Sequence, residues 1–436
     1  MSTTLVPSIF LRPDTRLLVA RRLPVVWGVT DAGLSSLATF VAGIFASRYL
    51  DPATLGAYAL VFSASVVAAI IPTQLFFVPG ETAAIALPDD TRLLAMRRTL
   101  LLGGGTNVVA ALAVSLAWLI IPGTIPAAAV AALVITGCAC ALASPIQDHV
   151  RRMLHLSGRS GVAALLSWIH AVVVIGTIAV AISLDTAPEW VPFGALAAGN
   201  IVSLLVGLAM SRLDDSREAP AFTAAQLAVA GRWLLVVGLL APGTAFLVAT
   251  IVAHVSGPAT LGYSEACRQV AHPLLVFATG LSTVIGPRLT AAAQERSSTR
   301  ARRSTRTFFV LMATVGVPYL LIAGRAGWWN PLATLLPNAY AIPGLVLATL
   351  AANVLNGLNF SQRAELLGAG QARTLARVEV AGNVMRMGVA AMAGALQSFA
   401  IPVGLIVLGI VRVIGYSRNL KRHYGAAPTI IPSSLR

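Results

Sequence analysis

The stretch Pro52-Ala-Thr-Leu-Gly56 returns as Pro258-Ala-Thr-Leu-Gly262, 206 positions further along the chain. In both copies one long apolar run leads into the motif and a second apolar run leaves it. Proline is favoured in the first turn of a helix, so each copy predicts a helix, a tight turn and another helix. Five identical residues in matching apolar surroundings are rare in unrelated segments. We therefore infer an internal duplication of about half the chain.

The composition around this repeat is that of a membrane protein. Hydrophobic residues make up 57% of the 436 residues, charged residues make up only 11%, and the mean hydropathy is +0.81. A soluble core cannot absorb this much apolar surface, whereas a helix of about 20 residues crosses the ~30 Å hydrocarbon layer of a membrane. We predict an all-α polytopic membrane protein with about twelve transmembrane helices in two six-helix lobes related by the internal repeat. The predicted spans are 23–47, 53–80, 99–121, 125–147, 162–184, 190–211, 233–253, 258–286, 307–323, 340–360, 378–397 and 399–416.

The distribution of charge predicts how the chain is oriented and divided. Almost all of the 31 Lys and Arg residues fall on the side of the membrane that holds the N-terminus, whereas Arg48 and Arg325 fall on the other side. Cytoplasmic loops are enriched in Lys and Arg, so we expect both termini in the cytoplasm. The predicted parts are a cytoplasmic tail (1–22), a first lobe (23–211), a cytoplasmic linker (212–232), a second lobe (233–416) and a second cytoplasmic tail (417–436).

Several kinds of partner are not expected from these patterns. The net charge of +15 is an orientation signal. Because the basic residues are spread over many loops without a binding motif, nucleic acid is not a predicted partner. The run Gly103-Gly-Gly-Thr-Asn107 lacks the lysine and the preceding strand of a phosphate-binding loop, so no bound nucleotide is predicted. Cys138 and Cys140 point to nearly opposite faces of a helix, so we predict no metal site and no other cofactor.

The chain is not expected to be an enzyme. Asp148 and His149 are adjacent, but a helix end among its counter-charges explains them more simply than a catalytic pair. Membrane polymerases and glycosyltransferases usually need catalytic residues in sizeable outer loops. The longest outer segment here, about 324–339, carries Arg325 as its only charge.

Glu265 and Arg268 are the strongest candidates for a functional pair. They lie within a predicted span, three residues apart and so on one helical face. At the 206-residue offset the first half of the chain has Ala59 and Phe62, so the pair is not part of the shared scaffold. Charged residues inside a membrane span are costly and mark functional sites. We favour this interpretation over a purely structural pair, because apolar residues would be the cheaper structural solution.

Two further carboxylates lie within predicted spans. Asp31 either faces the interior of the bundle or a wet cavity, or lies at a helix end and pairs with Arg21 or Arg22. Glu379 has an arginine nearby in the sequence, as Glu265 does. Neither pattern by itself decides between a functional and a structural role.

Two other features leave alternatives open. Arg48 lies at the outer mouth, where it is either an interfacial anchor or a residue that contacts substrate. Asn353, Asn356 and Asn359 share one helical face, and they either line a polar path or bond a neighbouring helix. The arginine-rich segment 288–306 is expected to meet anionic lipid headgroups.

Short motifs along most of the chain resemble the polysaccharide exporters of the O-antigen flippase type. They are an aspartate in the first span, the stretch Ala-Ser-Arg-Tyr-Leu-Asp-Pro-Ala-Thr-Leu-Gly-Ala-Tyr-Ala-Leu at 46–60, its copy in the second half, Leu-Leu-Pro-Asn-Ala-Tyr at 335–340 and Gly-Gln-Ala-Arg at 370–373. One departure is Pro337 and Asn338, which replace a usual glycine. Multidrug exporters of the same multidrug, oligosaccharidyl-lipid and polysaccharide exporter superfamily share twelve spans and two lobes, and they stay an alternative.

The resemblance implies a V-shaped pair of lobes around a central cavity between spans one, two, seven and eight. Such proteins flip a glycan linked to a polyprenyl diphosphate across the bacterial cytoplasmic membrane. The implied partners are this lipid-linked glycan, membrane lipids, and a polysaccharide polymerase and glycosyltransferases of the same pathway. Arginine offers a fixed fork for phosphate oxygens, which makes Arg268 the best cavity candidate. Glu265, Asp31 and Arg48 are the other candidates, and Asp31 or Glu265 could carry a coupling proton.

Overall fold

The computed structural model describes residues 13–85, 87–211, 222–323, 335–340 and 342–425, without the side chains of 13–25, 89, 90 and 283. Every regular element in these ranges is helical. The first lobe contains α1 (Pro13–Tyr49), α2 (Pro52–Pro72), the π-helix η1 (Thr73–Phe77), α3 (Val78–Ile85), α4 (Asp89–Ser115), α5 (Ala117–Ile120), α6 (Ala127–Leu156), α7 (Ser160–Ser183), η2 (Pro188–Trp190) and α8 (Val191–Met210). The second lobe contains α9 (Ala224–Val255), α10 (Pro258–Gln294), α11 (Ser298–Ala323), η3 (Asn338–Tyr340), α12 (Leu345–Gly368), α13 (Ala372–Ala391), α14 (Ala393–Leu396), η4 (Gln397–Phe399) and α15 (Ala400–Gly425).

The long helices correspond one to one with the twelve predicted spans. Within the described residues, nine are long and apolar enough to cross a membrane, and α10 is a tenth if its bent halves form one span. The bend of 46° lies next to residue 283, and Pro287 explains it because a proline ring clashes with the carbonyl four residues before it. Helices α12 and α13 also match predicted spans, but they are not among these ten because they carry more polar residues.

The helices extend beyond the predicted spans where charged residues begin. The span predicted to end at residue 147 continues as α6 to Leu156, and the span predicted to end at 286 continues as α10 to Gln294. The predicted ends of these two spans, at residues 147 and 286, were therefore too early. A hydropathy window ends where charges begin, whereas a helix continues for as long as its backbone hydrogen bonds do.

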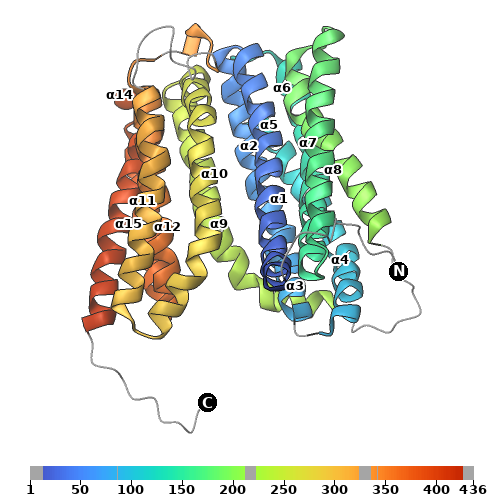
Figure 1. Cartoon of the computed structure of the whole chain (residues 1–436). Coiled ribbons are helices and arrows are strands. Elements are labelled where there is room, and N and C mark those ends of the chain that lie inside the picture. Colours follow the sequence, from blue (N-terminus) through green and yellow to red (C-terminus); the bar gives the residue numbers. More distant parts are fainter. Residues whose placement is uncertain (1–12, 86, 212–221, 324–334, 341, 426–436) are drawn as a thin grey trace.

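Successive long helices run in opposite directions, so the connections gather at two ends of the bundle (Figure 1). One of these we call the basic end, because Arg92, Arg159, Arg300 and Arg422 lie there, in or beside its connections and last helical turn. Helix α1 begins and α15 finishes at this same end. The described chain therefore makes an even number of passes, as the charge pattern predicts.

Two similar turns at the basic end reflect the internal repeat. Helix α6 leads to α7 through Gly158, and α12 leads to α13 through Gly370, and both glycines have positive φ angles, of 75° and 70°. In each turn the glycine N–H bonds a carbonyl three residues earlier, at 3.1 Å. The left-handed conformation carries no steric cost for glycine, which is why it commonly ends a helix.

The two copies of the repeated motif meet at the end opposite the basic end. Helices α2 and α10 form the largest contact between the lobes. A Cβ atom on Gly56 would lie 2.0 Å from the carbonyl oxygen of Pro258, and a Cβ on Gly262 would lie 1.9 Å from that of Pro52. The duplicated glycines therefore let the two helix starts pack backbone to backbone in a reciprocal contact. This is the tertiary role of the motif.

Neighbouring residues support this junction. Asp51 caps α2, because its carboxylate accepts hydrogen bonds from the amides of Ala53 at 2.9 Å and Thr54 at 3.2 Å. Burial by itself would raise the pKa of Asp51, but these bonds and one from the Thr54 side chain hold it below its ordinary value. From the second lobe, the buried Tyr340 donates its hydroxyl hydrogen to the carbonyl of Leu50 at 2.7 Å.

Helix α9 makes a second connection between the lobes, nearer the basic end. It packs on α2, η1 and α3 of the first lobe as well as on α13 of the second. A Cβ on Gly231 would lie 2.4 Å from the carbonyl oxygen of Gln74, inside the π-helix. The lobes are thus held together at the motif end by α2 and α10, and toward the basic end by α9.

Candidate functional site

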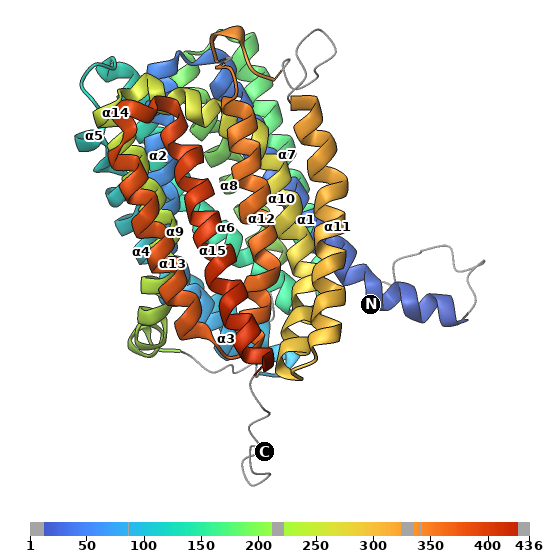
Figure 2. The same ribbon diagram turned by 90° about the vertical axis from the view of Figure 1, so that its left-hand side faces the viewer.

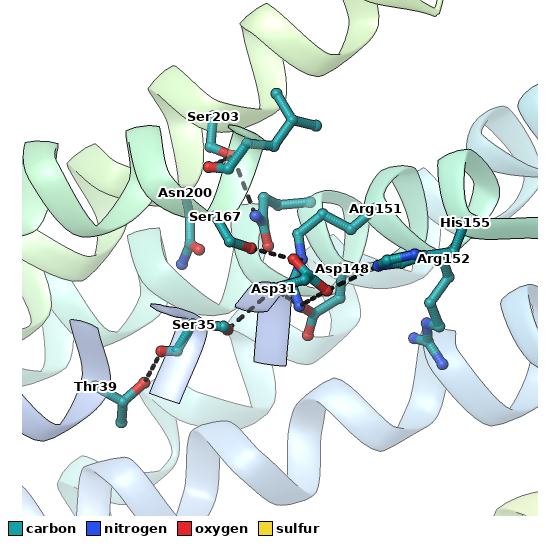
Figure 3. Close-up of polar contacts among 12 residues, drawn as sticks. Asp31, Ser35, Thr39, Asp148, Arg151, Arg152, His155, Ser167, Asn200 and Ser203 are labelled. Carbon is teal, nitrogen blue, oxygen red and sulfur yellow. Dashed lines mark hydrogen bonds and ion pairs between the residues drawn. The ribbon is translucent and has the colours of Figure 1, made fainter. Parts of the chain in front are cut away.

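Asp31 lies at the centre of a buried polar cluster in the first lobe. Its carboxylate accepts two hydrogen bonds from the guanidinium of Arg151, each at 3.0 Å, and one from Ser167 (Figure 3). The Nε2 atom of His155 lies 3.0 Å from the Asp31 Oδ2 atom. The side chain of Asp31 is only 8% exposed. The partners come from α6 and α7, so the cluster joins α1 to both helices.

Arg151 connects this cluster to a cavity. Besides Asp31, its guanidinium donates to Ser35 at 3.0 Å and to Asp148 at 3.1 Å. Both of these residues line a cavity of about 300 Å³. Its wall is formed by residues of α1, α2, α6, α7 and α8, so it lies inside the first lobe and not between the lobes. Eight of the residues that line it are polar, namely Ser35, Thr39, Ser65, Ser144, Gln147, Asp148, His170 and Asn200.

Phe62 separates this cavity from the second lobe. Its ring lines the cavity, and the guanidinium of Arg268 lies over the same ring, 5.3 Å from the ring centroid. Such an arrangement is a cation–π contact. Tyr58 and Phe193 extend the aromatic cluster, with their ring centroids 4.8 Å apart. Arg268 is thus positioned at the junction of the two lobes, one aromatic ring away from the cavity of the first.

Glu265 holds Arg268 in a bidentate ion pair, as the helical spacing predicts. The Arg268 Nε atom lies 2.7 Å and its Nη2 atom 2.6 Å from the two carboxylate oxygens. Gln269 donates a further hydrogen bond to Glu265. The Glu265 side chain is 7% exposed, whereas that of Arg268 is 32% exposed. The carboxylate is therefore enclosed, while part of the Arg268 side chain is exposed.

The four predicted cavity candidates do not form a single site. Glu265 and Arg268 are in direct contact, and Asp31 belongs to the separate cluster in the first lobe. Arg48 is exposed in the last turn of α1, 17 residues from Asp31, which corresponds to about 25 Å along the helix. Of the two interpretations of Asp31, the structure supports the one that faces the bundle interior, while the side chains of Arg21 and Arg22 lie outside the described residues.

The arginine partners of Asp31 and Glu379 were not predicted from the sequence. Asp148, Arg151 and His155 lie beyond the predicted end of the span 125–147, although their spacing of three and four residues places them on one helical face. In the second lobe, Arg412 was also overlooked. Its Nη2 atom lies 2.6 Å from the carboxylate of Glu379. Asp31, Glu265 and Glu379 each contact an arginine, but only the partner of Glu265 lies close to it in the sequence.

The three asparagines of α12 bond neighbouring helices. Asn353 donates to the carbonyl of Ala271 on α10 at 3.0 Å. Asn356 donates to the carbonyl of Leu405 at 3.0 Å, and Asn359 to that of Gly409 at 3.2 Å, both on α15. Their amides therefore join helices, and the first of the two interpretations, a polar path, is not needed to explain them.

Comparison with solved structures places this arrangement among known folds. No protein-family profile matches the chain, and no curated protein matches it in sequence. The chain is similar to an inward-facing structure of a multidrug resistance MATE family transporter of the MOP superfamily, with a TM-score of 0.71 and 14% identity over 91% of this chain and 96% of that one. It has the fold of the MOP superfamily transporters.

Two more solved structures with this fold are useful for comparison. The lipid II flippase MurJ in an inward closed conformation has a TM-score of 0.65 and 11% identity, over 92% of this chain and 89% of that one. An outward-facing structure of a MATE family transporter has a TM-score of 0.61 and 11% identity, over 92% and 95% of the two chains. The two-lobed helical architecture predicted from the sequence is thus confirmed.

Proposed function

We propose that this protein is a transporter that flips a glycan linked to a polyprenyl diphosphate across the bacterial cytoplasmic membrane by alternating access. The observation that carries the proposal is the guanidinium of Arg268. It lies at the junction of the lobes and over the aromatic wall of the first-lobe cavity, and the Arg268 side chain is 32% exposed. Arginine is suited to bidentate recognition of phosphate oxygens, and an anionic cargo is the natural partner of such a group.

Glu265 gives this site a way to release its cargo. Its carboxylate occupies the two donor positions of Arg268 that a phosphate would use. Cargo phosphate and Glu265 therefore compete for the same guanidinium. A proton on Glu265 weakens its hold on Arg268, and loss of that proton restores the ion pair and expels the phosphate. This exchange would couple transport to protons without a bound cofactor.

The contact of the repeated motifs supports alternating access. In this structure the lobes are closed at the motif end by the Gly56 and Gly262 contacts and by Tyr340 on Leu50. With the basic end in the cytoplasm, this closed end faces outside. The higher TM-score to an inward-facing structure than to an outward-facing one is in keeping with that arrangement. Transport then requires the motif end to separate in the alternate state.

A small-molecule exporter is the second candidate function. It is favoured by the size of the first-lobe cavity, about 300 Å³, and by the aromatic rings of Phe62 and Phe193 on its wall. These dimensions suit a compact organic molecule. The similar MATE structures are described as multidrug resistance transporters. Fold alone does not decide between these cargoes, because function resides in the site.

Depletion of the protein in its native cells distinguishes the two functions. If the cargo is a lipid-linked glycan, depleted cells accumulate that glycan on the cytoplasmic leaflet and lose a surface polysaccharide, while their sensitivity to cationic dyes is unchanged. Increased dye sensitivity with normal surface glycan would instead establish the exporter function and overturn our proposal.

The competition between Glu265 and cargo is tested with purified protein. Farnesyl diphosphate serves as a water-soluble probe that carries the same diphosphate group. We expect Glu265→Gln to bind this probe roughly tenfold more tightly than wild type, because the charge-assisted bonds to Arg268 no longer oppose binding. Gln269→Leu is the matched control, since it removes a partner of Glu265 but leaves the competing carboxylate. Equal affinity of Glu265→Gln and wild type would contradict the release mechanism.

A further inference from the structure

A groove on the second lobe encloses about 940 Å³, roughly three times the volume of the first-lobe cavity. It lies between α11 and α15, with α12 as its floor. Figure 2 shows these three helices side by side on the face of the second lobe turned toward the viewer, with α12 in the middle. Helix α11 packs on α10 and α12, and α15 packs on α12 and α13. The groove is thus separated from the junction of the lobes by the body of the second lobe.

Basic side chains line the groove near the basic end. Arg302 and Arg306 lie on the first turns of α11, and Lys421 lies on the last turns of α15. All three residues are exposed, and within the described residues no carboxylate forms an ion pair with them. By contrast, the neighbouring Arg300 is paired with Glu295. The groove therefore presents three cations without internal counter-ions.

The carboxylate that lines this groove does not neutralise those cations. Glu365 lies on α12, is only 6% exposed, and accepts a hydrogen bond from the hydroxyl of Tyr424 at 2.7 Å. Beside it, Gln362 donates to Ser417 at 3.1 Å, and its side-chain oxygen is buried without a partner. The floor is thus polar and enclosed, whereas the positive charges line the rim.

The wall becomes apolar with distance from the basic end. Along α11 the residues Arg302, Arg306, Phe309, Val310 and Ala313 face the groove, at the three- and four-residue spacing of one helical face. The step from Arg302 to Ala313 covers about 16 Å along the axis, roughly half of the hydrocarbon layer. The groove therefore has cations at the membrane surface and apolar side chains below them, which matches the charged headgroup and the apolar chains of a phospholipid.

We propose that this groove binds one anionic phospholipid of the leaflet at the basic end. Its phosphate lies among Arg302, Arg306 and Lys421, and its acyl chains lie on Phe309 and Val310. Basic pockets between transmembrane helices on the cytoplasmic side are suited to anionic headgroups. The groove faces away from the junction of the lobes, which argues for a resident lipid and against cargo. Lipid binding in this groove does not depend on the proposed transport function.

Native mass spectrometry of the full-length protein tests this site. Protein in detergent is incubated with equimolar phosphatidylglycerol and phosphatidylethanolamine, and the lipid retained per protein is measured. We expect wild type to retain one phosphatidylglycerol, and Arg302→Gln with Arg306→Gln to lose affinity roughly 30-fold, which corresponds to about 1 kcal/mol for each basic residue. Retention equal to wild type would overturn the proposal.

The matched control removes the same amount of charge from the two helices that form the walls of the groove, α11 and α15. Arg303→Gln with Arg418→Gln alters exposed arginines of α11 and α15 that do not line the groove, so retention should be unchanged. An equal loss in both double variants would show only general surface attraction and would also overturn the proposal. Both variants are compared only as monodisperse proteins in size-exclusion chromatography.

Two further arms identify the source of the ligand. Ala313→Trp fills the apolar wall without a change of charge, and we expect it to abolish retention of the lipid. If it does not, the acyl chains do not lie in the groove and the proposal fails. Displacement of phosphatidylglycerol by millimolar inorganic phosphate would identify a simple anion site, and preferential displacement by farnesyl diphosphate would assign the groove to cargo. Either result would overturn the assignment to a resident phospholipid.

Discussion

Substitution of the motif glycines by alanine is expected to open the contact between the lobes. The new methyl group of Gly56→Ala would lie 2.0 Å from the carbonyl oxygen of Pro258, whereas ordinary van der Waals contact begins at 3.4 Å. The two helices must therefore move apart by about 1.4 Å. The obstacle is backbone and not a flexible side chain, so it cannot rotate away. Gly262→Ala meets the same obstacle at Pro52.

The size of the effect follows from the cost of overpacking. Extra methyl groups in a well-packed interior cost about 1 to 3 kcal/mol. Because this cost applies only to the state that is closed at the motif end, it shifts the equilibrium toward the open state by roughly 5- to 150-fold. We expect the double variant to shift the equilibrium by less than the sum of the two single shifts in free energy, because one separation of the helices relieves the clashes of both methyl groups.

Double electron–electron resonance distances provide the assay. Leu184 and Met392 are suitable positions for the spin labels, because both are exposed, lie at the motif end and belong to different lobes. The wild-type distance distribution should gain a longer component in Gly56→Ala and in Gly262→Ala. Gly176→Ala is the matched control, because a Cβ there would meet no atom within 4 Å apart from its own helical backbone, so the distance distribution should not change. An unchanged distance distribution in both motif variants would refute the conclusion that this glycine contact holds the lobes closed at the motif end.

Three further predictions follow from the charged residues. Arg268→Ala should abolish transport at normal expression, and Arg268→Lys should retain part of it, because a point charge replaces a bidentate fork; normal transport by the alanine variant would remove this residue from the site. Arg151→Gln should lower the free energy of unfolding by about 3 to 5 kcal/mol, because it leaves the buried charge of Asp31 unpaired. Adding Asp31→Asn to this variant should restore part of the loss, and a double variant less stable than Arg151→Gln alone would contradict this prediction. In a cysteine-free background, a single cysteine at 187 should react with an impermeant label from outside and one at 300 should not, and the reverse would overturn the orientation.

Topological expectations at positions 215 and 328 lie outside the described residues. The same labelling assay applies to them, with 215 expected in the cytoplasm and 328 outside. The boundaries of the tails and of the linker stay predictions as well. Helix α8 ends at Met210, just before the predicted linker 212–232, whereas α9 begins at Ala224, inside that linker.

The sequence predicted the class of the fold because hydropathy is a local property. A window of about 20 residues is enough to recognise a span, and the alternation of basic connections counts the passes. The pair Glu265 and Arg268 was also predictable, since three residues on one helix share a face by geometry alone. The repeated motif indicated duplication, although nothing in its letters showed that its two copies touch each other.

The tertiary structure alone decided which distant groups meet. Asp31 and Arg151 are separated by 120 residues, and Glu379 and Arg412 by 33, so no local pattern pairs them. The same holds for the groove that α11 and α15 form over α12. The sequence determines each helix and the faces it carries, because those depend on backbone hydrogen bonds within one segment. Which faces meet depends on the packing of helices that are far apart in the chain. The physical reason is that a charge buried in a membrane is tolerated only where a neighbouring helix supplies its partner.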